Sequence, residues 1–538
     1  MNSIWNKNYA LFKKRFPQLA EMLPAPENPE KLAESLWETA RSKAGALTAS
    51  EGGVRLHSAY NPEREAAGAV AGAGLENKST VVFYGFGLGY HVIECARKFP
   101  DKKIVLIEPD AGHFFAALTL LDWEDVFKVE KLVIAVGCPE EQIIHLIEDT
   151  SKVGFSQDEL AFFDIAPFTT HAAAYFENIR TIIKRNKRRN EINAATLKKF
   201  GKLWCRNSLR NITQLAECGS VTGCVGAAGL AGATAGRSDT EDVLPFLICG
   251  AGPSLESILP QLKEISHKAV IICVETSLHA LQRAGVEPDF ILLTDPQFWA
   301  YRHIAGLSAP KSILITEVST YPSVFRFPCK AILLCKSQFP IGNWFEEEFS
   351  LELGDLGTGG SVASCAWNFA HLCGAREIYT AGLDFAFPTG QTHIKGSSAE
   401  QSWHTTSNRL AGAEKAVSAT IHSANIQKAD DNTGGQVLTD SRMKMFAWWF
   451  EARLAACPET KTYTLCPGGL KVPGISPAPL SQLLEKENIT EKKAAFIKQA
   501  EKTKPCLPQA QKARLEKMLE NFPSPDFLAK YGFLGEYL

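Results

Sequence analysis

A turn near the middle of the chain has the residue types best suited to bind an anionic ligand. The apolar run from Phe246 to Cys249 leads directly into Gly250-Ala251-Gly252-Pro253-Ser254. Glycine permits close approach of the backbone to a ligand, and proline suits the first turn of a helix. The free N–H groups and the dipole at a helix start favour a phosphate. We therefore interpret Gly250, Gly252, Pro253 and Ser254 as a phosphate-binding turn, with a plain strand-to-helix connection as the alternative.

Polar residues follow two further apolar runs of the same region. Glu275 and Thr276 come directly after residues 269–274, and Asp295 follows residues 290–294. In open parallel sheets, ligands bind outside the carboxyl ends of the strands. These residues are therefore candidates for the same site, although a solvated loop carboxylate is the simpler explanation for each one alone.

A second glycine-rich segment and a third strand end continue the series. Thr358, Gly359, Gly360 and Ser361 precede an apolar helical stretch, and their small side chains and hydroxyls suit an anion or a sugar. Further along, Gly382, Leu383 and Asp384 end another strand, and His393 follows within ten residues. Imidazole titrates near neutral pH, so His393 is a candidate general base.

The pattern of apolar runs predicts the elements that position these residues. In residues 79–150 and again in residues 244–395, short apolar runs alternate with helical stretches, which is typical of a parallel sheet with right-handed crossovers. The fold class is therefore α/β with two Rossmann-like units and a helical C-terminal region. The strands expected in the first region are 80–84, 103–107 and 131–136, and those in the second are 245–249, 269–274, 290–294, 312–316, 331–335 and 377–381.

These runs and the composition between them suggest four parts. Residues 1–217 form an N-terminal helical and Rossmann-like domain, in which residues 1–75 and 151–217 are expected to be helical. A linker or loop rich in glycine and alanine covers residues 218–242. The central catalytic domain spans residues 243–475, and within it the polar segment 396–435 is expected to be loosely packed and mobile. Residues 476–538 are expected to be helical.

Composition excludes several classes of function. The 538 residues carry a formal net charge of −2, so no overall basic field indicates nucleic acid, and we expect the basic run 184–189 to be a solvated helix face. There is neither a run of 18 apolar residues nor a signal peptide, so we expect no membrane span. The 14 cysteines lack the paired spacing of a metal site and fit reduced core residues of a cytoplasmic protein.

Taken in order, these motifs resemble a known set. In chain order, the motifs are GAGPSLE, Asp-Pro, GTGGS with its helix, GLDF, a downstream histidine and LCPGGL. This set is similar to that of the motility accessory factor (Maf) flagellin glycosyltransferases. The central region also resembles the smaller bacterial sialyltransferases. The resemblance covers residues 244–470, and the N-terminal α/β region and helical C-terminus fit the larger Maf layout.

The resemblance implies an inverting transfer of a nonulosonic (sialic-like) acid from a CMP-activated donor to Ser or Thr of flagellin. It implies flagellin and a sugar nucleotide as partners, and no metal or other cofactor. By the same resemblance, Gly250, Gly252, Pro253 and Ser254 hold CMP, and Asp295 contacts the ribose or the donor. Thr358, Gly359, Gly360 and Ser361 hold the phosphate and carboxylate of the donor, and the nucleoside pocket is shaped by Gly382, Asp384, Cys466 and Pro467.

The catalytic residues are less closely matched than the donor-binding ones. Asp295 stands where the sialyltransferases have Asn, and Phe385 stands where they have a Tyr that assists departure of the phosphate. His393 is the expected base, with His404 as the alternative. A hydroxymethylpterin pyrophosphokinase-like enzyme and a non-catalytic flagellin-binding factor remain alternative functions.

The N-terminal region has a glycine-rich turn of its own, Gly85-Phe86-Gly87-Leu88-Gly89-Tyr90, and Glu108 ends its second strand. This pairing is similar to the nucleoside site of a methyltransferase. A lone glycine-rich turn is a weak signal, and a structural or acceptor-binding role is the other interpretation.

Overall fold

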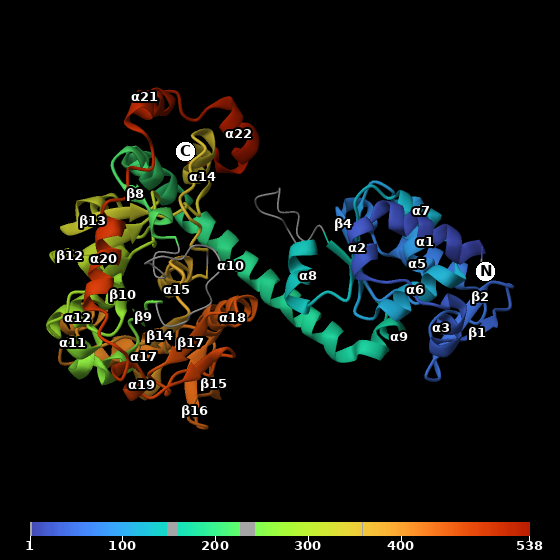
Figure 1. Cartoon of the computed structure of the whole chain (residues 1–538), viewed down its shortest axis with the longest axis horizontal. Coiled ribbons are helices and arrows are strands. Elements are labelled where there is room, and N and C mark those ends of the chain that lie inside the picture. The colour runs from blue at the N-terminus through green and yellow to red at the C-terminus, as the bar shows by residue number, and fades with distance from the viewer. Residues whose placement is uncertain (1–2, 148–159, 226–242, 358) are drawn as a thin grey trace. The chain divides into compact units, whose positions relative to one another are not determined.

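A computed structural model describes residues 3–147, 160–225, 243–357 and 359–538 of the chain (Figure 1). The chain divides into two compact units, Met1–Ala194 and Ala195–Leu538. The division falls within one long helix, α10 (Ala173–Asn211), whereas the sequence suggests a boundary at residue 217.

The first unit contains a four-stranded parallel sheet in the order β6-β5-β4-β7. The strands are β4 (Thr80–Tyr84), β5 (Lys103–Glu108), β6 (Leu132–Val136) and β7 (Leu160–Asp164). The first three match the strands predicted from the sequence, and the parallel α/β class is confirmed. β7 lies in a segment expected to be helical, because its five residues are too few to show a period beside the long pattern of α10.

Helices and a small antiparallel sheet complete this unit. The helices include α1 (Ser3–Arg15), α2 (Pro17–Met22), α3 (Pro29–Leu36), α4 (Pro62–Gly72), α5 (Tyr90–Lys98), α6 (Ala111–Leu120), α7 (Glu124–Lys128) and α8 (Glu140–Ile147). The small sheet is formed by β1 (Glu38–Arg41), β2 (Leu47–Glu51) and β3 (Val54–Arg55). The expectation that residues 1–75 contain only helices and loops is therefore wrong, because strands this short show no recognisable apolar alternation.

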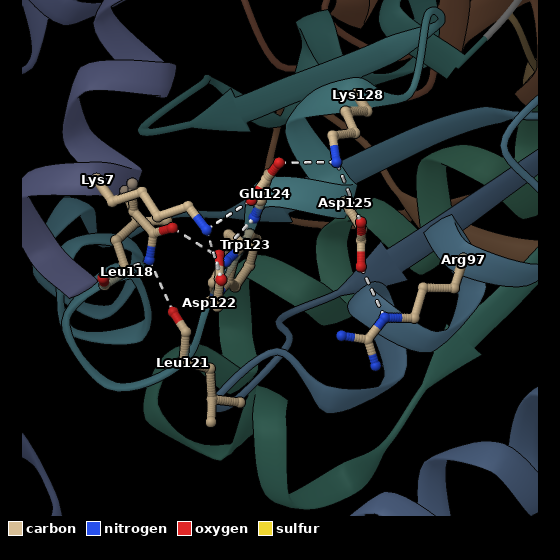
Figure 2. Close-up of polar contacts among 10 residues, drawn as sticks. Lys7, Arg97, Leu118, Leu121, Asp122, Trp123, Glu124, Asp125 and Lys128 are labelled. Carbon is tan, nitrogen blue, oxygen red and sulfur yellow. Dashed lines mark hydrogen bonds and ion pairs between the residues drawn. The ribbon is translucent and has the colours of Figure 1, made fainter.

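A buried asparagine connects α1 to the loop between α6 and α7. Asn8 is completely buried, and its Nδ2 donates to the carbonyl oxygens of Leu118 (2.8 Å) and Leu121 (2.7 Å). Its Oδ1 accepts from the backbone N–H of Trp123 at 3.0 Å. The neighbouring Lys7 pairs with Asp122 at the surface, as Figure 2 shows. The amide of Asn8 therefore satisfies three backbone groups that no helix bond covers.

Replacing Asn8 by alanine should lower the free energy of unfolding of the first unit by about 3 kcal/mol, because buried backbone groups lose their partners. Chemical denaturation followed by circular dichroism measures this change. Lys7→Ala is the matched control on the same helix turn, and we expect it to change stability little, because exposed ion pairs contribute little. Equal stability of Asn8→Ala and wild type would contradict this role for the amide.

The second unit is built around a nine-stranded parallel sheet in the order β18-β17-β14-β9-β10-β11-β12-β13-β8. Its strands are β8 (Gly219–Ser220), β9 (Phe246–Cys249), β10 (Val270–Val274), β11 (Phe290–Leu292), β12 (Ala309–Thr316), β13 (Cys329–Leu334), β14 (Glu377–Ala381), β17 (Lys461–Thr464) and β18 (Ile475–Pro477). All six strands predicted for residues 244–395 are present. The central strands are buried on both faces, which explains their continuous apolar runs.

Alternate residues of the central strands enter separate cores on the two faces of the sheet. Phe246 and Ile248 pack with α15 (Val362–Leu372), α18 (Ser441–Ala456) and α20 (Thr490–Glu501). Leu247 and Cys249 face the opposite core, which contains residues of α11 (Leu262–Ile265), α12 (Leu278–Arg283) and α13 (Phe298–Ile304). This two-sided cover is the layered arrangement expected of a doubly wound fold.

Two segments differ from what their composition suggests. Residues 218–225, placed in the predicted linker, contain β8 and the buried side chains of Val221 and Cys224; residues 226–242 of that linker lie outside the described residues. Small side chains are needed here, because a Cβ on Gly223 would lie 2.5 Å from Thr503 Oγ1 and 2.7 Å from Thr503 Cγ2. The glycine-rich composition therefore reflects close packing as far as Cys224.

The polar segment 396–435 is also structured. It contains α16 (Ser398–Thr406) and α17 (Ala413–Ile421), and it continues into a hairpin of β15 (Ile426–Asp430) and β16 (Gln436–Asp440). The hairpin contacts the segment that follows β14, since Thr439 donates to the carbonyl oxygen of Phe385 at 2.7 Å. The segment therefore has regular secondary structure, while most of its side chains are exposed or half-buried, which agrees with the expected loose packing.

The C-terminal region is helical, as expected. It contains α19 (Leu480–Leu484), α20, α21 (Lys512–Glu520) and α22 (Pro525–Tyr531). Phe496 of α20 packs against Phe246 and Phe290 and so belongs to the central core. Among the described residues, no helix has the length and apolar character needed to cross a bilayer.

Candidate active site

The predicted binding turn lies where the strand order of the large sheet reverses. β9 pairs with β10 on one side and with β14 on the other. The backbone N–H of Gly250 donates to Ala381 and that of Gly252 donates to Gly382, both at 2.8 Å. The turns after β9 and β14 therefore lie against each other, which is the usual place for a ligand in such sheets.

Asp384 occupies the helix start after this turn. Its carboxylate accepts from the backbone N–H of Ser254 at 3.1 Å and from the Ser254 hydroxyl. The following helix is a five-residue 3-10 turn, Pro253–Ser257, and burial raises the pKa of Asp384. Three amides expected to face a phosphate, those of Gly250, Gly252 and Ser254, are thus already hydrogen-bonded within the chain. The glycines instead permit the two turns to approach, because a Cβ on Gly252 would lie 2.7 Å from the Gly382 oxygen.

The Cys-Pro turn closes the same side of the site. Cys466 Sγ lies 3.3 Å from the carbonyl oxygen of Ser254 and 3.4 Å from the Ser257 hydroxyl. The exposed Pro467 accepts a hydrogen bond from the backbone N–H of Asn432 at 3.1 Å. The structure therefore brings together the turns of Gly250–Ser254, Gly382–Asp384 and Cys466–Pro467.

Three carboxylates, two of them buried and Asp295 half-buried, lie at the next strand ends. Glu275 follows β10, Asp295 follows the run that begins with β11, and Glu317 follows β12. Burial, with repulsion from Asp295, raises the pKa of Glu275 to about 8. Burial also raises the pKa values of Asp295 and Glu317. The Oε2 atom of Glu275 is buried and has no hydrogen-bond partner among the described residues, and Thr276 donates to its other oxygen at 3.2 Å.

Three functional candidates at this edge were not predicted from the sequence. Glu317 follows its strand directly, so the rule that selected Glu275 and Asp295 also applies to it. Asn207 of α10 donates to the carbonyl oxygen of Pro296 at 3.0 Å, and Asn211 donates to that of Thr320 at 2.7 Å. The four-residue spacing of these asparagines on one helix face was the signal that could have identified them.

The second glycine-rich segment forms the start of α15 near the same strand ends. Ser361 is the N-cap residue and its side chain makes no capping bond, while Thr358 lies outside the described residues. Gly359 packs against Ser364, and Gly360 has a positive φ of 76° beside Phe446. The hydroxyl of Thr294, next to Asp295, lies 3.7 Å from Cys365 Sγ in the first turn of the helix.

His393 lies beside the Gly250–Ser254 turn. The next residue, Ile394, donates its backbone N–H to the carbonyl oxygen of Ala251 at 2.8 Å. Burial and the positive charge of Arg442 lower the pKa of His393, so its imidazole stays neutral near pH 7. His404, the alternative base, is exposed in the last turn of α16.

The glycine-rich turn of the first unit is filled by protein side chains. His57 Nε2 accepts from the backbone N–H of Leu88 at 3.0 Å, and a Cβ on Gly87 would lie 2.7 Å from the same nitrogen. Gly85 and Gly89 lie directly against Phe168 and Trp123. The space a nucleoside would need is therefore occupied, which favours a structural role for this turn.

Comparison with known families matches two parts of the chain. Residues 54–149 match the family model described as the glycosyltransferase Maf N-terminal domain. Residues 236–390 match the model described as 6-hydroxymethylpterin diphosphokinase MptE-like. The first match covers three strands of the parallel sheet of the first unit, β4 to β6, and the second covers β9 to β14 of the large sheet but not β17, which precedes the Cys466–Pro467 turn.

Individual proteins and a solved structure are also similar to this chain. An uncharacterized protein of Treponema pallidum (strain Nichols) is 37% identical over 230 residues, which are 37% of this chain and 58% of the relative. A second uncharacterized protein of that organism is 30% identical over 267 residues, which are 48% of this chain and 85% of the relative. The solved structure of a Maf glycosyltransferase from Magnetospirillum magneticum AMB-1 shares the fold, with a TM-score of 0.55 and 17% identity over 93% of this chain and 78% of that one.

Proposed function

We propose that this chain, a member of the Maf family, is a glycosyltransferase that moves a nonulosonic acid from a CMP-activated donor to a Ser or Thr hydroxyl of flagellin. The observation that carries the proposal is the meeting of three turns at the reversal point of the large sheet, beside buried carboxylates and a neutral histidine. The match to the Maf N-terminal domain and the shared fold support the same activity.

Donor binding is divided between two places on this edge. The nucleoside lies against the turns of Gly252, Asp384 and Cys466, where the carboxylate of Asp384 and backbone atoms offer hydrogen-bond partners. The phosphate and the sugar carboxylate lie at the start of α15, where backbone N–H groups and the helix dipole favour negative charge. The phosphate thus binds at Gly359–Ser361 and not, as the sequence suggested, at the Gly250–Ser254 turn, because the amides of that turn are already hydrogen-bonded within the chain.

The chemical step requires a base and a stabilised leaving group. The acceptor hydroxyl gives its proton to the neutral imidazole of His393 as its oxygen forms a bond to the anomeric carbon of the sugar. The bond from that carbon to the phosphate oxygen breaks, and CMP leaves with the electron pair. The amides at the start of α15 stabilise the charge on the departing phosphate.

Glu275 should make donor binding dependent on pH. With a pKa of about 8 it is protonated at pH 7, so it can donate a hydrogen bond to an anionic donor. Above pH 8 it ionises and repels the donor, and CMP affinity should fall about tenfold between pH 7 and pH 9. Calorimetry at both pH values measures this, and Glu275→Gln should keep nearly constant affinity.

The raised pKa of Glu275 also makes the stability of the folded chain depend on pH. Because the pKa of Glu275 is higher in the folded than in the unfolded chain, its contribution to stability is present below pH 4.5 and is lost as the pH rises through about 8. The Glu275→Gln variant should not show this loss of stability as the pH rises. An equal fall of CMP affinity in wild type and Glu275→Gln would assign the pH effect to another group.

The helix pair α16–α17 is proposed to close over the bound donor. Its connecting turn is exposed, with Leu410 93% accessible and Arg409 beside it. Trypsin should cut after Arg409 several-fold more slowly when the CMP-activated sugar is bound, because closure shields the turn and excludes water. Arg409→Gln should abolish that fragment and so identify it. Equal cleavage rates with and without the donor would contradict a donor-coupled lid.

A nucleotide screen tests the proposed class of donor. Thermal unfolding in the presence of CMP, UDP, GDP or ATP with magnesium should show stabilisation by CMP above the others, since only a ligand of the folded state raises the transition. Stabilisation by ATP and magnesium alone would instead favour diphosphate transfer, the activity in the description of the MptE-like family.

A further inference from the structure

The exposed face of α13 is aromatic, although the helix belongs to the unit that carries the candidate site. Phe298 is 40% exposed and Trp299 is 64% exposed, and Arg302 is exposed one helical turn further on. All ten tryptophans of the chain are among the described residues, and Trp299 is the only one of them that is exposed. The other side of the helix, with Ala300 and Ile304, is buried in a core of the large sheet. Large apolar side chains that lie together on a surface indicate a binding surface, whereas scattered ones do not.

The helix lies between the groups to which we assign the chemistry. It begins three residues after Asp295, and it packs against the turn that starts with Glu275. Near its other end, burial and the charge of His393 lower the pKa of His303 to about 4, so the two histidines are neighbours. An acceptor that presents its hydroxyl to His393 therefore has α13 beside it.

Contacts behind the aromatic face hold it in place. Asn207 donates to the carbonyl oxygen of Pro296, just before the helix, at 3.0 Å. The ring of Tyr321 stacks on that of Tyr301 with 5.3 Å between centroids, and it meets the ring of Phe298 edge-on at 5.2 Å. A surface that is fixed before binding loses little conformational entropy when its partner arrives.

The same face offers a positive charge to a partner. The Arg302 guanidinium lies 5.9 Å from the centre of the Trp299 ring, and among the described residues it has no ion-pair partner. Tryptophan and arginine are enriched at the energetic centres of protein–protein interfaces. A polypeptide can present an apolar side chain to Trp299 and a carboxylate to Arg302 at the same time. A sugar ring could also stack on the indole, but the carboxylate of the donor sugar is assigned to the start of α15.

We propose that Phe298, Trp299 and Arg302 form a docking surface for the acceptor polypeptide, which binds there through an apolar and an acidic side chain close to the Ser or Thr that receives the sugar. The inference rests on the proposed function, because it names the part of that site that selects the acceptor. Trp299 and Arg302 bind the acceptor and take no part in the chemical step, so they determine the KM for the acceptor and not the affinity for the donor.

The KM for flagellin, measured by CMP release, tests this surface. Trp299→Ala should raise that KM at least tenfold and leave kcat and CMP affinity nearly unchanged, because a contact made equally before and during the chemical step affects KM alone. Trp299→Phe keeps an aromatic ring and should retain most of the affinity. Arg302→Glu should raise the KM more than Arg302→Lys, since it repels a carboxylate.

Tyr60→Ala is the matched control for loss of an exposed aromatic ring. Tyr60 belongs to the first unit, is 65% exposed and has the Lys43 ammonium 4.3 Å from the centre of its ring. Its environment is thus similar to that of Trp299, and we expect the variant to keep the wild-type KM for flagellin. Circular dichroism checks that each variant is folded.

Calorimetry of flagellin with the full chain, in the absence of donor, separates this inference from the proposed function. Flagellin binding that Trp299→Ala loses, without CMP release by the wild type, would contradict the transferase and support the docking surface. Wild-type binding and KM in both Trp299→Ala and Arg302→Glu would overturn the docking surface and leave the transferase in place. Failure of the wild type to bind flagellin would overturn both.

Two further results would assign Trp299 to another occupant and so overturn the proposal. The first is weaker binding of the CMP-activated sugar by Trp299→Ala with an unchanged KM for flagellin, which would place the donor sugar on the indole. The second is a wild-type dimer that Trp299→Ala converts to monomers without a change in flagellin binding, which would place a second copy of the chain there. Analytical ultracentrifugation measures the oligomeric state.

Discussion

Exchange of His393 for asparagine should lower the rate of transfer to flagellin about a hundredfold or more and leave CMP affinity nearly unchanged. A serine or threonine hydroxyl is a poor nucleophile at neutral pH, and burial together with Arg442 keeps the His393 imidazole in its basic form. Asparagine retains a polar side chain of similar size but cannot accept the proton. Steady-state kinetics of CMP release, with calorimetry of CMP, separates the two effects.

His404→Asn is the matched control, since His404 is exposed on α16 and makes no contact with the Gly250–Ser254 turn through its ring in the described structure. We expect it to transfer the sugar at the wild-type rate. Normal activity of His393→Asn together with inactivity of His404→Asn would place the base on α16. Normal activity of both variants would exclude a histidine base.

Valine in place of Gly252 should abolish detectable CMP binding. Its side chain would collide with the Asp384 carboxylate and with the Gly382 carbonyl oxygen, which lies 2.7 Å from the position of a Cβ. Asp384 would be displaced from Ser254, and the turns that form the nucleoside pocket would separate. Calorimetry of CMP measures the loss, and circular dichroism shows whether the fold survives.

Gly68→Val is the control for a bulky side chain at a glycine. Gly68 lies in α4 of the first unit, and a Cβ there meets no atom within 4 Å. This variant should bind CMP as wild type does. Undiminished CMP binding by Gly252→Val would contradict the placement of the nucleoside between these turns.

Residues at strand ends could be located from the sequence because a parallel sheet places them together. The apolar runs that precede Glu275, Asp295 and Asp384 are continuous, since the strands are buried on both faces, and so their ends are visible in the sequence. Glu317 follows the same rule. The location of these carboxylates at the ends of the sheet strands was thus predictable from the sequence.

The hydrogen-bond partners of these turns could not be predicted from the sequence. The glycine-rich turn at Gly250 has the residues of a phosphate site, but its amides bond to the neighbouring turn, and that depends on which strands are adjacent. The spacing of His113 and His171 gives no sign that their rings stack, because the two rings meet only when α6 and the turn after α9 (Ala166–Thr169) lie side by side. Glycine in residues 218–225 serves close packing, which composition alone does not distinguish from a linker.

The central claim is tested most directly by incubating the chain with flagellin and a CMP-activated nonulosonic acid and measuring CMP release beside the intact mass of flagellin. We predict that CMP appears in step with a mass increase of one or more sugar residues, and only when both substrates are present. Binding of flagellin without CMP release would contradict the claim and indicate a non-catalytic flagellin-binding factor.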